Sequence, residues 1–212
     1  MSEIHLEILD KKRQQVFQKL ARFRHFGYLA GGTALALQIG HRKSVDFDVF
    51  VRRAIRPSLK HLVQSVFGKQ SFYVNTGDQI SFTTVEGIGI TFVWYYYPLL
   101  YPQIKTDSIG LATVLDIAAD KAETIGRRAV WRDYVDFFFL LKKKLTTIDQ
   151  IIALATKKFE GEFIETQFLQ QLTYYADLEV MPIEYIGESY TPEEIKSLLE
   201  EAVKGNLKKI LP

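Results

Sequence analysis

Residues 31–48 of the chain read GGTALALQIGHRKSVDFD, which is the pattern of a two-glycine turn, a short helix, a basic loop and a strand. Side chains alternate between the faces of a strand, so Asp46 and Asp48 should project together while Phe47 faces the buried side. Two neighbouring carboxylates repel each other, and Mg²⁺ relieves such repulsion because it prefers hard oxygen ligands. Gly31 and Gly32 lead into a helix N-terminus, whose free N–H groups and dipole favour phosphate. The stretch therefore predicts nucleotide chemistry.

The rest of the chain predicts an α+β protein with a small mixed β-sheet flanked by helices and a helical C-terminal half. We expect a core domain over residues 1–108, which carries the glycine pair and the two aspartates, and a helical region over residues 109–212 that completes the cleft. The expected helices are 4–26, 33–39, 57–67, 112–126 and 133–144, with Asp133 as the N-cap of the last, and the expected strands are 28–30, 45–52, 72–76, 79–85 and 88–96.

Composition places the chain among ordinary soluble proteins, with 47% hydrophobic and 25% charged residues. The net charge of +2 gives no electrostatic argument for a nucleic-acid partner. The absence of cysteine excludes disulfides and thiolate metal sites, and it fits the cytoplasm, where we expect the protein. The longest apolar stretch, residues 89–101, is too short to span a bilayer, so we expect no membrane partner.

Three motifs, in the right order and spacing, resemble the AbiEii/AbiGii toxin group of the nucleotidyltransferase fold, within the polymerase-β-like superfamily. The first is GGTALALQIGHRKSVDFDVFV at residues 31–51. The second is DIAADKAETIGRR at residues 116–128, which is similar to the lysine-bearing helix of that group. The third is RDYVDF at residues 132–137, a basic residue followed by Asp-x-x-Asp.

The resemblance implies that Asp46 and Asp48 hold Mg²⁺ or Mn²⁺ and that Gly31, Gly32 and Thr33 hold the triphosphate of an NTP. It also implies that Lys121 and Asp133 are catalytic together with the two metal-binding aspartates, with Arg132 or Asp136 helping Asp133 to organise the far wall of the pocket. The further residues that we expect to contact the nucleotide are Arg42, Ser44, Lys121 and Arg128.

One feature departs from the superfamily pattern. Competent members commonly add a third carboxylate from a neighbouring strand, and here Thr91 stands in the expected place. A hydroxyl cannot serve as the general base that activates an acceptor. Other acids that could substitute are Glu86, Asp107 and Asp120.

Several of these residues also have simpler interpretations. Lys121 could be a lysine that extends from an apolar helix face to solvent, and Asp133 could be only a helix cap. The aromatic cluster at residues 94–97 could stack on bases beside basic residues or could pack at a strand end.

The resemblance implies Mg²⁺-dependent transfer of a nucleotide monophosphate from an NTP to an acceptor hydroxyl on RNA, such as tRNA. The protein would be the toxin of a toxin–antitoxin or phage-defence system, with a cognate antitoxin as partner. Two alternatives remain open. The chain could be a catalytically silent nucleotide- or RNA-binding module that lacks the third carboxylate, or an interaction protein whose aspartates are exposed and idle.

Overall fold

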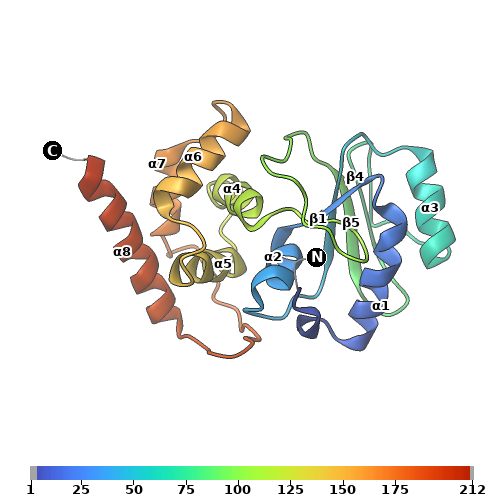
Figure 1. The fold of residues 1–212 in the computed structure, drawn as a ribbon, viewed down its shortest axis with the longest axis horizontal. Helices are drawn as coiled ribbons and strands as arrows, with labels where there is room; N and C mark the ends of the chain where they lie inside the picture. The colour runs from blue at the N-terminus through green and yellow to red at the C-terminus, as the bar shows by residue number, and fades with distance from the viewer. Residues whose placement is uncertain (1–3, 211–212) are drawn as a thin grey trace. The chain divides into compact units, whose positions relative to one another are not determined.

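The computed structural model describes residues 4–210, and the chain divides into two compact units, Met1–Thr113 and Val114–Pro212. Figure 1 draws the first unit from blue to green and the second from green to red. Among the residues that the structure describes, no helix combines the length and the hydrophobicity needed to cross a bilayer.

The first unit is built on a five-stranded mixed sheet of order β1-β2-β5-β4-β3. Strand β2 runs parallel to β5, whereas the pairs β1–β2, β4–β5 and β3–β4 are antiparallel. The elements in chain order are η1 (Leu6–Ile8), α1 (Lys11–Lys19), η2 (Leu20–Phe23), β1 (Gly27–Ala30), α2 (Gly31–Ile39), β2 (Phe47–Val51), α3 (Pro57–Phe67), β3 (Val74–Asn75), β4 (Gln79–Thr83) and β5 (Gly89–Trp94).

Aromatic side chains attach the helices α1 and α3 and the turn η2 to one face of this sheet. The ring centroids of Phe23 and Phe92 lie 4.9 Å apart, and those of Phe67 and Phe82 lie 5.6 Å apart. Helix α2 packs on β1 and β2 and lies on the other side of the sheet from α1 and α3 (Figure 1). Its sequence is apolar almost all round, as expected of a buried helix.

The second unit contains five helices in its described residues: α4 (Val114–Ile125), α5 (Trp131–Lys142), α6 (Ile148–Phe159), α7 (Glu165–Leu172) and α8 (Pro192–Ile210). Helix α4 packs on α5, α6 and α7, and α8 packs on α5, α6 and α7. The core is aromatic, since Tyr134, Phe137, Phe159 and Phe168 are all buried. The predicted α+β fold with a helical C-terminal half is therefore confirmed.

Three details of the predicted elements are wrong. The N-terminal helix is broken into η1, α1 and η2, and β2 begins at Phe47, so Asp46 lies just before the strand. Asp133 is not an N-cap, because α5 begins at Trp131 and its N-cap is Val130. Trp131 is only 3% exposed, and burying this side chain outweighs the local capping preference of Asp133.

Residues just after position 108 belong with the sheet of the first unit. Leu111 forms a bridge with Leu29 of β1, and the Ala112 N–H donates to the Leu29 carbonyl at 2.9 Å. The functional assignment of a catalytic core to residues 1–108 and of a cleft-completing region to residues 109–212 stays a prediction.

Candidate functional site

The two aspartates of the first motif lie at the start of β2, beside the beginning of α2. Phe47 is fully buried, whereas Asp48 is half-buried and Asp46 is exposed, as the alternation of a strand requires. Ala30, the last residue of β1, pairs with Asp48, and the next residue, Gly31, already belongs to α2. The pairing of β1 with β2 therefore brings the helix N-terminus next to the carboxylates.

Glycines leave room for both carboxylates. Gly31 has a φ of +65°, and a Cβ on it would lie 3.0 Å from Asp48 Oδ2. A Cβ on Gly89, at the start of β5, would lie 2.7 Å from Asp46 Oδ1. Any other residue at either position would press on a carboxylate oxygen, so these glycines keep space open beside the carboxylates of both aspartates.

The N-terminus of α2 is suited to an anion. The helix is nine residues long, and its N-cap is Ala30, which has no side-chain oxygen with which to cap the first N–H groups. Gly31 and Gly32 are both partly accessible. Free N–H groups and the positive end of the helix dipole make such a terminus a binding place for phosphate.

Two predicted nucleotide contacts, Thr33 and Ser44, form hydrogen bonds at the loop that carries Asp46. The Thr33 hydroxyl donates to the Asp46 carbonyl, so its single proton is committed there. Ser44 Oγ, 2.6 Å from Thr33 Oγ1, must then be the donor between the two hydroxyls. Arg13 Nε adds a hydrogen bond to the Val45 carbonyl at 3.0 Å. Both hydroxyl residues are buried, and their hydrogen bonds fix the backbone of this loop.

Arg42, another predicted nucleotide contact, lies in the loop between α2 and β2 but is not exposed. Only 3% of its surface is accessible, and its Nη1 donates to the Lys43 carbonyl at 3.1 Å. The structure therefore places Arg42 in the same unit as the aspartates, with part of its guanidinium used to brace the basic loop.

The neighbouring strand offers a hydroxyl where a third carboxylate was expected. Thr91 of β5 pairs with Asp48 in the parallel ladder, so the two side chains share a face. Thr91 Oγ1 lies 3.1 Å from the hydroxyl of Ser81 on β4. Within the described part of the chain, no group of three or more His, Cys, Asp or Glu side chains is placed to hold a metal ion.

The three acids that could substitute for the third carboxylate have different surroundings. Glu86 lies in the turn between β4 and β5, where a hydrogen bond from Thr84 holds its pKa below the usual value, and its carboxylate is 3.8 Å from Lys19 Nζ. Asp107 is exposed on the loop after β5. Asp120 belongs to the second unit, where it forms an ion pair with Lys158 at 2.7 Å.

The donor set in the first unit still suits a divalent cation. Mg²⁺ is commonly held in proteins by one or two carboxylates, with substrate phosphates and water completing its octahedron. Asp46 and Asp48 supply two carboxylates beside a helix N-terminus that can take the phosphates. The residues present therefore fit a metal that is shared with a nucleotide.

In the second unit, Lys121 of α4 is buried between two aspartates of α5. Its Nζ lies 2.5 Å from Asp133 Oδ1 and 2.7 Å from Asp136 Oδ2, and the lysine is only 7% exposed. The interpretation of Lys121 as a lysine that reaches solvent is therefore wrong. Arg128 and Arg132 are exposed near the ends of α4 and α5. We call Lys121, Asp133 and Asp136 the Lys121 cluster.

A second cluster of the same composition, which the sequence does not predict, lies between α4 and α6. Lys158 Nζ, on α6, lies 3.2 Å from Asp116 Oδ1 and 2.7 Å from Asp120 Oδ1, and the Lys158 side chain is fully buried. The only sequence signal was that Asp116 and Asp120 are four residues apart on one helix. Nothing local indicates a lysine 38 residues further along the chain. We call these three residues the Lys158 cluster.

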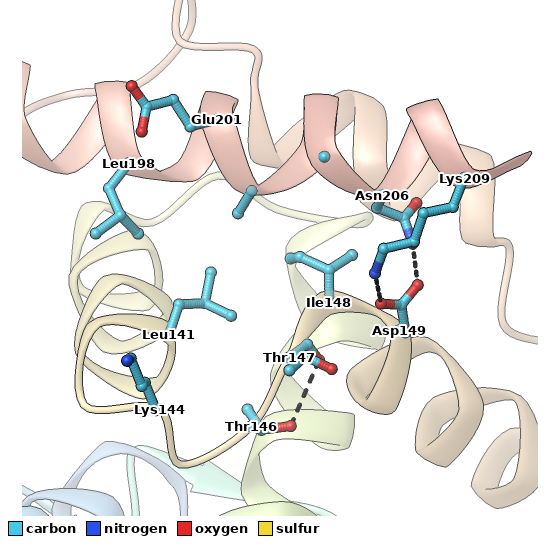
Figure 2. A pocket seen from close by; sticks show the side chains of 12 residues that line it. Leu141, Lys144, Thr146, Thr147, Ile148, Asp149, Leu198, Glu201, Asn206 and Lys209 are labelled. Atoms are coloured by element: carbon cyan, nitrogen blue, oxygen red, sulfur yellow. Dashed lines mark hydrogen bonds and ion pairs between the residues drawn. The ribbon is translucent and has the colours of Figure 1, made fainter. Parts of the chain in front are cut away.

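The second unit also has a cavity of about 630 Å³ between the end of α5, the start of α6 and α8 (Figure 2). Asp149 at its rim accepts hydrogen bonds from Lys209 Nζ at 2.6 Å and from Asn206 Nδ2 at 2.7 Å. No predicted site residue is among the described residues that line it. The cavity is therefore distinct from both lysine clusters.

Known structures share this fold. A Helicobacter pylori protein described as a candidate nucleotidyltransferase matches with a TM-score of 0.59 at 17% identity, over 96% of this chain and 100% of that one. MenT4, a nucleotidyltransferase toxin of Mycobacterium tuberculosis, matches with a TM-score of 0.58 at 13% identity, over 90% of this chain and 80% of that one. At these identities the likeness shows the fold alone.

Sequence comparison goes further. The uncharacterized protein aq_aa25 of Aquifex aeolicus is 31% identical over 208 residues, which cover 94% of this chain and 98% of the relative. Residues 17–205 match the family model described as nucleotidyl transferase AbiEii toxin, type IV toxin–antitoxin system. The chain therefore belongs to the AbiEii nucleotidyltransferase toxin family.

Proposed function

We propose that this toxin transfers a nucleotide monophosphate from an NTP to an acceptor hydroxyl, using Mg²⁺ or Mn²⁺ held by Asp46 and Asp48. The observation that carries the proposal is the pairing of Ala30 with Asp48, which brings two carboxylates and an uncapped helix N-terminus to one place. That combination serves metal-bound triphosphate, because carboxylates hold the cation and N–H groups hold the anion.

Each group of the first unit has a distinct task in this proposal. The N–H groups at the start of α2 bind phosphate oxygens of the NTP, and Gly31 lets the backbone approach Asp48 closely. When bound, the metal neutralises charge on the phosphates during an in-line displacement. Thr33 and Ser44 keep the Asp46 loop in place, so the two carboxylates stay preorganised.

Lys121 and Asp133 enter the proposed catalytic set through the family motifs that they occupy. The family match over residues 17–205 includes both. The two carboxylates of the Lys121 cluster fix the ammonium group in one position, which suits an electrostatic role. Arg42 and Arg128 are proposed as further phosphate contacts.

The proposed acceptor is RNA, such as tRNA, and the proposed partner is a cognate antitoxin in the cytoplasm, within a toxin–antitoxin or phage-defence system. The family's description as a type IV toxin–antitoxin system and the naming of MenT4 as a nucleotidyltransferase toxin support this assignment. With Thr91 beside Asp48, the acceptor hydroxyl must react without a carboxylate base on the neighbouring strand.

The test is transfer of label from each of four α-labelled NTPs to total cellular RNA and protein, with Mg²⁺ or with EDTA. We expect labelled RNA that requires the metal and disappears with Asp46→Asn/Asp48→Asn. Asp78→Asn, which changes an exposed carboxylate in the turn before β4, is the control and should keep transfer. Undiminished labelling by the double variant would refute the assignment of the two aspartates.

A catalytically silent binding module is the second candidate, because Thr91 occupies the place of the third acid. It predicts that NTP with Mg²⁺ raises the melting temperature of the protein, since a ligand that binds only the folded state stabilises it. It also predicts that no NTP labels any acceptor. Stabilisation without labelling would favour this candidate over the enzyme.

A further inference from the structure

A basic pocket lies in the first unit, at the far end of β2 from the two aspartates. It has a volume of about 420 Å³ and lies between the ends of η2 and β2 and the start of α3. Its basic lining residues are His25, Arg52, Arg53 and Arg56. Arg52 lies four positions after Asp48 and directly after the end of β2, which is about 13 Å at 3.3 Å per residue. The pocket is therefore outside the proposed metal site.

The positive charge of this pocket is not neutralised locally. All three arginines and His25 are exposed. Among residues 4–210, no carboxylate lines the pocket and none forms an ion pair with Arg52, Arg53 or Arg56. Three exposed guanidinium groups therefore surround one concavity that no carboxylate of the described residues lines. Their planar donor forks match phosphate oxygens.

The start of α3 adds to this positive field. Arg56 is the N-cap of this 11-residue helix and Pro57 its first residue, so no side-chain acceptor occupies the cap position. Ser58, in the first turn, also lines the pocket. The positive end of the helix dipole therefore points to the same concavity as the arginines.

Two exposed aromatic side chains lie at or just after the end of β5, the strand that pairs with β2. Trp94 pairs with Val51, a lining residue of the pocket, so the two side chains share a face of the sheet. Trp94 is 38% exposed and Tyr96 is 80% exposed, with their ring centroids 6.4 Å apart. Tyr95, in contrast, packs on Phe50, and the centroids of the two rings lie 4.2 Å apart. The aromatic cluster of residues 94–97 thus has a packing part and an exposed part.

We infer that the pocket and the rings of Trp94 and Tyr96 form a binding site for single-stranded RNA. The arginines bind backbone phosphates, and the two rings stack on unpaired bases. A groove that combines positive charge with exposed aromatic rings is the usual architecture for single strands, because stacking requires bases that are not paired. This inference rests on the proposed function in one respect, namely that the RNA bound here is the acceptor.

The first experiment measures binding of a fluorescent 12-nucleotide single-stranded RNA to the full chain by anisotropy over a range of salt concentrations. Arg52→Ala/Arg53→Ala/Arg56→Ala should weaken binding at least about tenfold and reduce the magnitude of the negative slope of log K against log[salt] by about 2, because each phosphate contact contributes about −0.7 to that slope for single strands. Tyr96→Ala should weaken binding on the order of tenfold with an unchanged salt slope, since stacking releases no counterions.

The control removes the same charge elsewhere in the unit. Lys11→Ala/Lys12→Ala/Lys69→Ala replaces three exposed cations outside the pocket, and it should change binding much less. Equal losses in the two triple variants would overturn the site, as would wild-type binding by the arginine variant. Equal affinity for a 12-base-pair duplex would overturn the assignment to single strands.

Failure of this site can be told apart from failure of the proposed function. Asp46→Asn/Asp48→Asn should bind the RNA as wild type does, because its substitutions lie outside the pocket. In label transfer, the arginine variant should raise the KM for RNA and keep the stabilisation by NTP and Mg²⁺. If the wild type transfers no label but loses RNA binding with the arginines, the binding site stands and the enzyme is refuted.

Discussion

The two units of this toxin use aspartates in opposite ways. In the first unit, Asp46 is exposed, Asp48 is half-buried, and both lie against glycine backbone. In the second unit, the aspartates of the Lys121 and Lys158 clusters are buried and ion-paired with lysine. The surroundings of an aspartate therefore decide what it suits. Carboxylates with space beside them are suited to a metal ion, whereas carboxylates paired with a lysine of another helix connect the two helices.

Each lysine cluster holds two aspartates around one lysine. Asp116 lies in the first turn of α4 and Asp133 in the first turn of α5. The positive end of a helix dipole stabilises a carboxylate there. The ion pairs, the hydrogen bonds and the helix N-termini therefore all stabilise the buried carboxylates. Removing a buried lysine should lower the stability of the protein more than changing an exposed aspartate does.

The largest effect is expected from Lys158→Met. It removes the ammonium group of Lys158 from the buried carboxylates of Asp116 and Asp120, and the loss of one partner of a buried pair costs about 3–5 kcal/mol in the free energy of unfolding. Lys157→Met, on the exposed neighbour, should change it by less than about 0.5 kcal/mol. Urea unfolding measures both. Similar values for the two variants would mean that the buried cluster does not hold α4 and α6 together.

The roles of the two clusters can be distinguished by replacing all the charged side chains of one cluster at a time. Lys158→Met/Asp116→Asn/Asp120→Asn should recover most of the stability lost in Lys158→Met, because no buried charge is left unpaired, and it should keep label transfer. The corresponding triple variant of the Lys121 cluster should also be stable, but we expect it to lose transfer by on the order of 10²-fold or more. Full activity in that variant would show the Lys121 cluster to be structural as well.

The sequence could predict those parts of the fold and site that depend on local pattern. Apolar alternation around Phe47 sets the faces of β2, and the burial of Phe47 and exposure of Asp46 follow from it. The glycine pair and the two aspartates lie close because a short helix and loop return the chain to the strand beside β1.

What could not be predicted depends on distant partners. Lys158 meets Asp116 across 42 residues, and only the packing of α6 on α4 brings them together. Asp133 failed as a predicted cap because the burial of Trp131 set the start of α5. The basic pocket could not be predicted either. Arg52, Arg53 and Arg56 have no regular spacing, and only the folded chain shows that they line one pocket with His25.

A smaller effect is expected from glycine substitutions that test the space beside Asp48. Gly31 and Gly68 both have positive φ, of +65° and +79°, so alanine at either should cost about 1–3 kcal/mol of stability. Only at Gly31 would the new Cβ press on a carboxylate, because no described heavy atom lies within 4 Å of a Cβ on Gly68. Gly31→Ala alone should therefore abolish the rise in melting temperature caused by NTP with Mg²⁺. Loss of that rise in Gly68→Ala too would attribute the effect to strain.

The smallest effect concerns Asp149. Its carboxylate is exposed, like that of Asp46, but is paired with a lysine, like the aspartates of the two clusters. Lys209 and Asn206 donate to Asp149 and lower the pKa of its carboxyl. Because the folded pKa is depressed, this stabilisation is present above the unfolded pKa of about 3.9 and is lost as the pH falls through the folded value. Lys209→Met should cost less than about 1 kcal/mol at pH 7 and less still at pH 3. Urea midpoints at both pH values test this, and an equal loss at pH 3 would contradict it.

The most direct test is a titration of Mn²⁺ by electron paramagnetic resonance in the presence of NTP. It compares the wild type, Asp46→Asn/Asp48→Asn and the charge-free triple variant of the Lys158 cluster. If only the aspartates of the first unit hold metal, the wild type and the triple variant bind Mn²⁺ with the same affinity and the double variant does not. Undiminished Mn²⁺ binding by Asp46→Asn/Asp48→Asn, or its loss in a folded triple variant, would contradict that assignment.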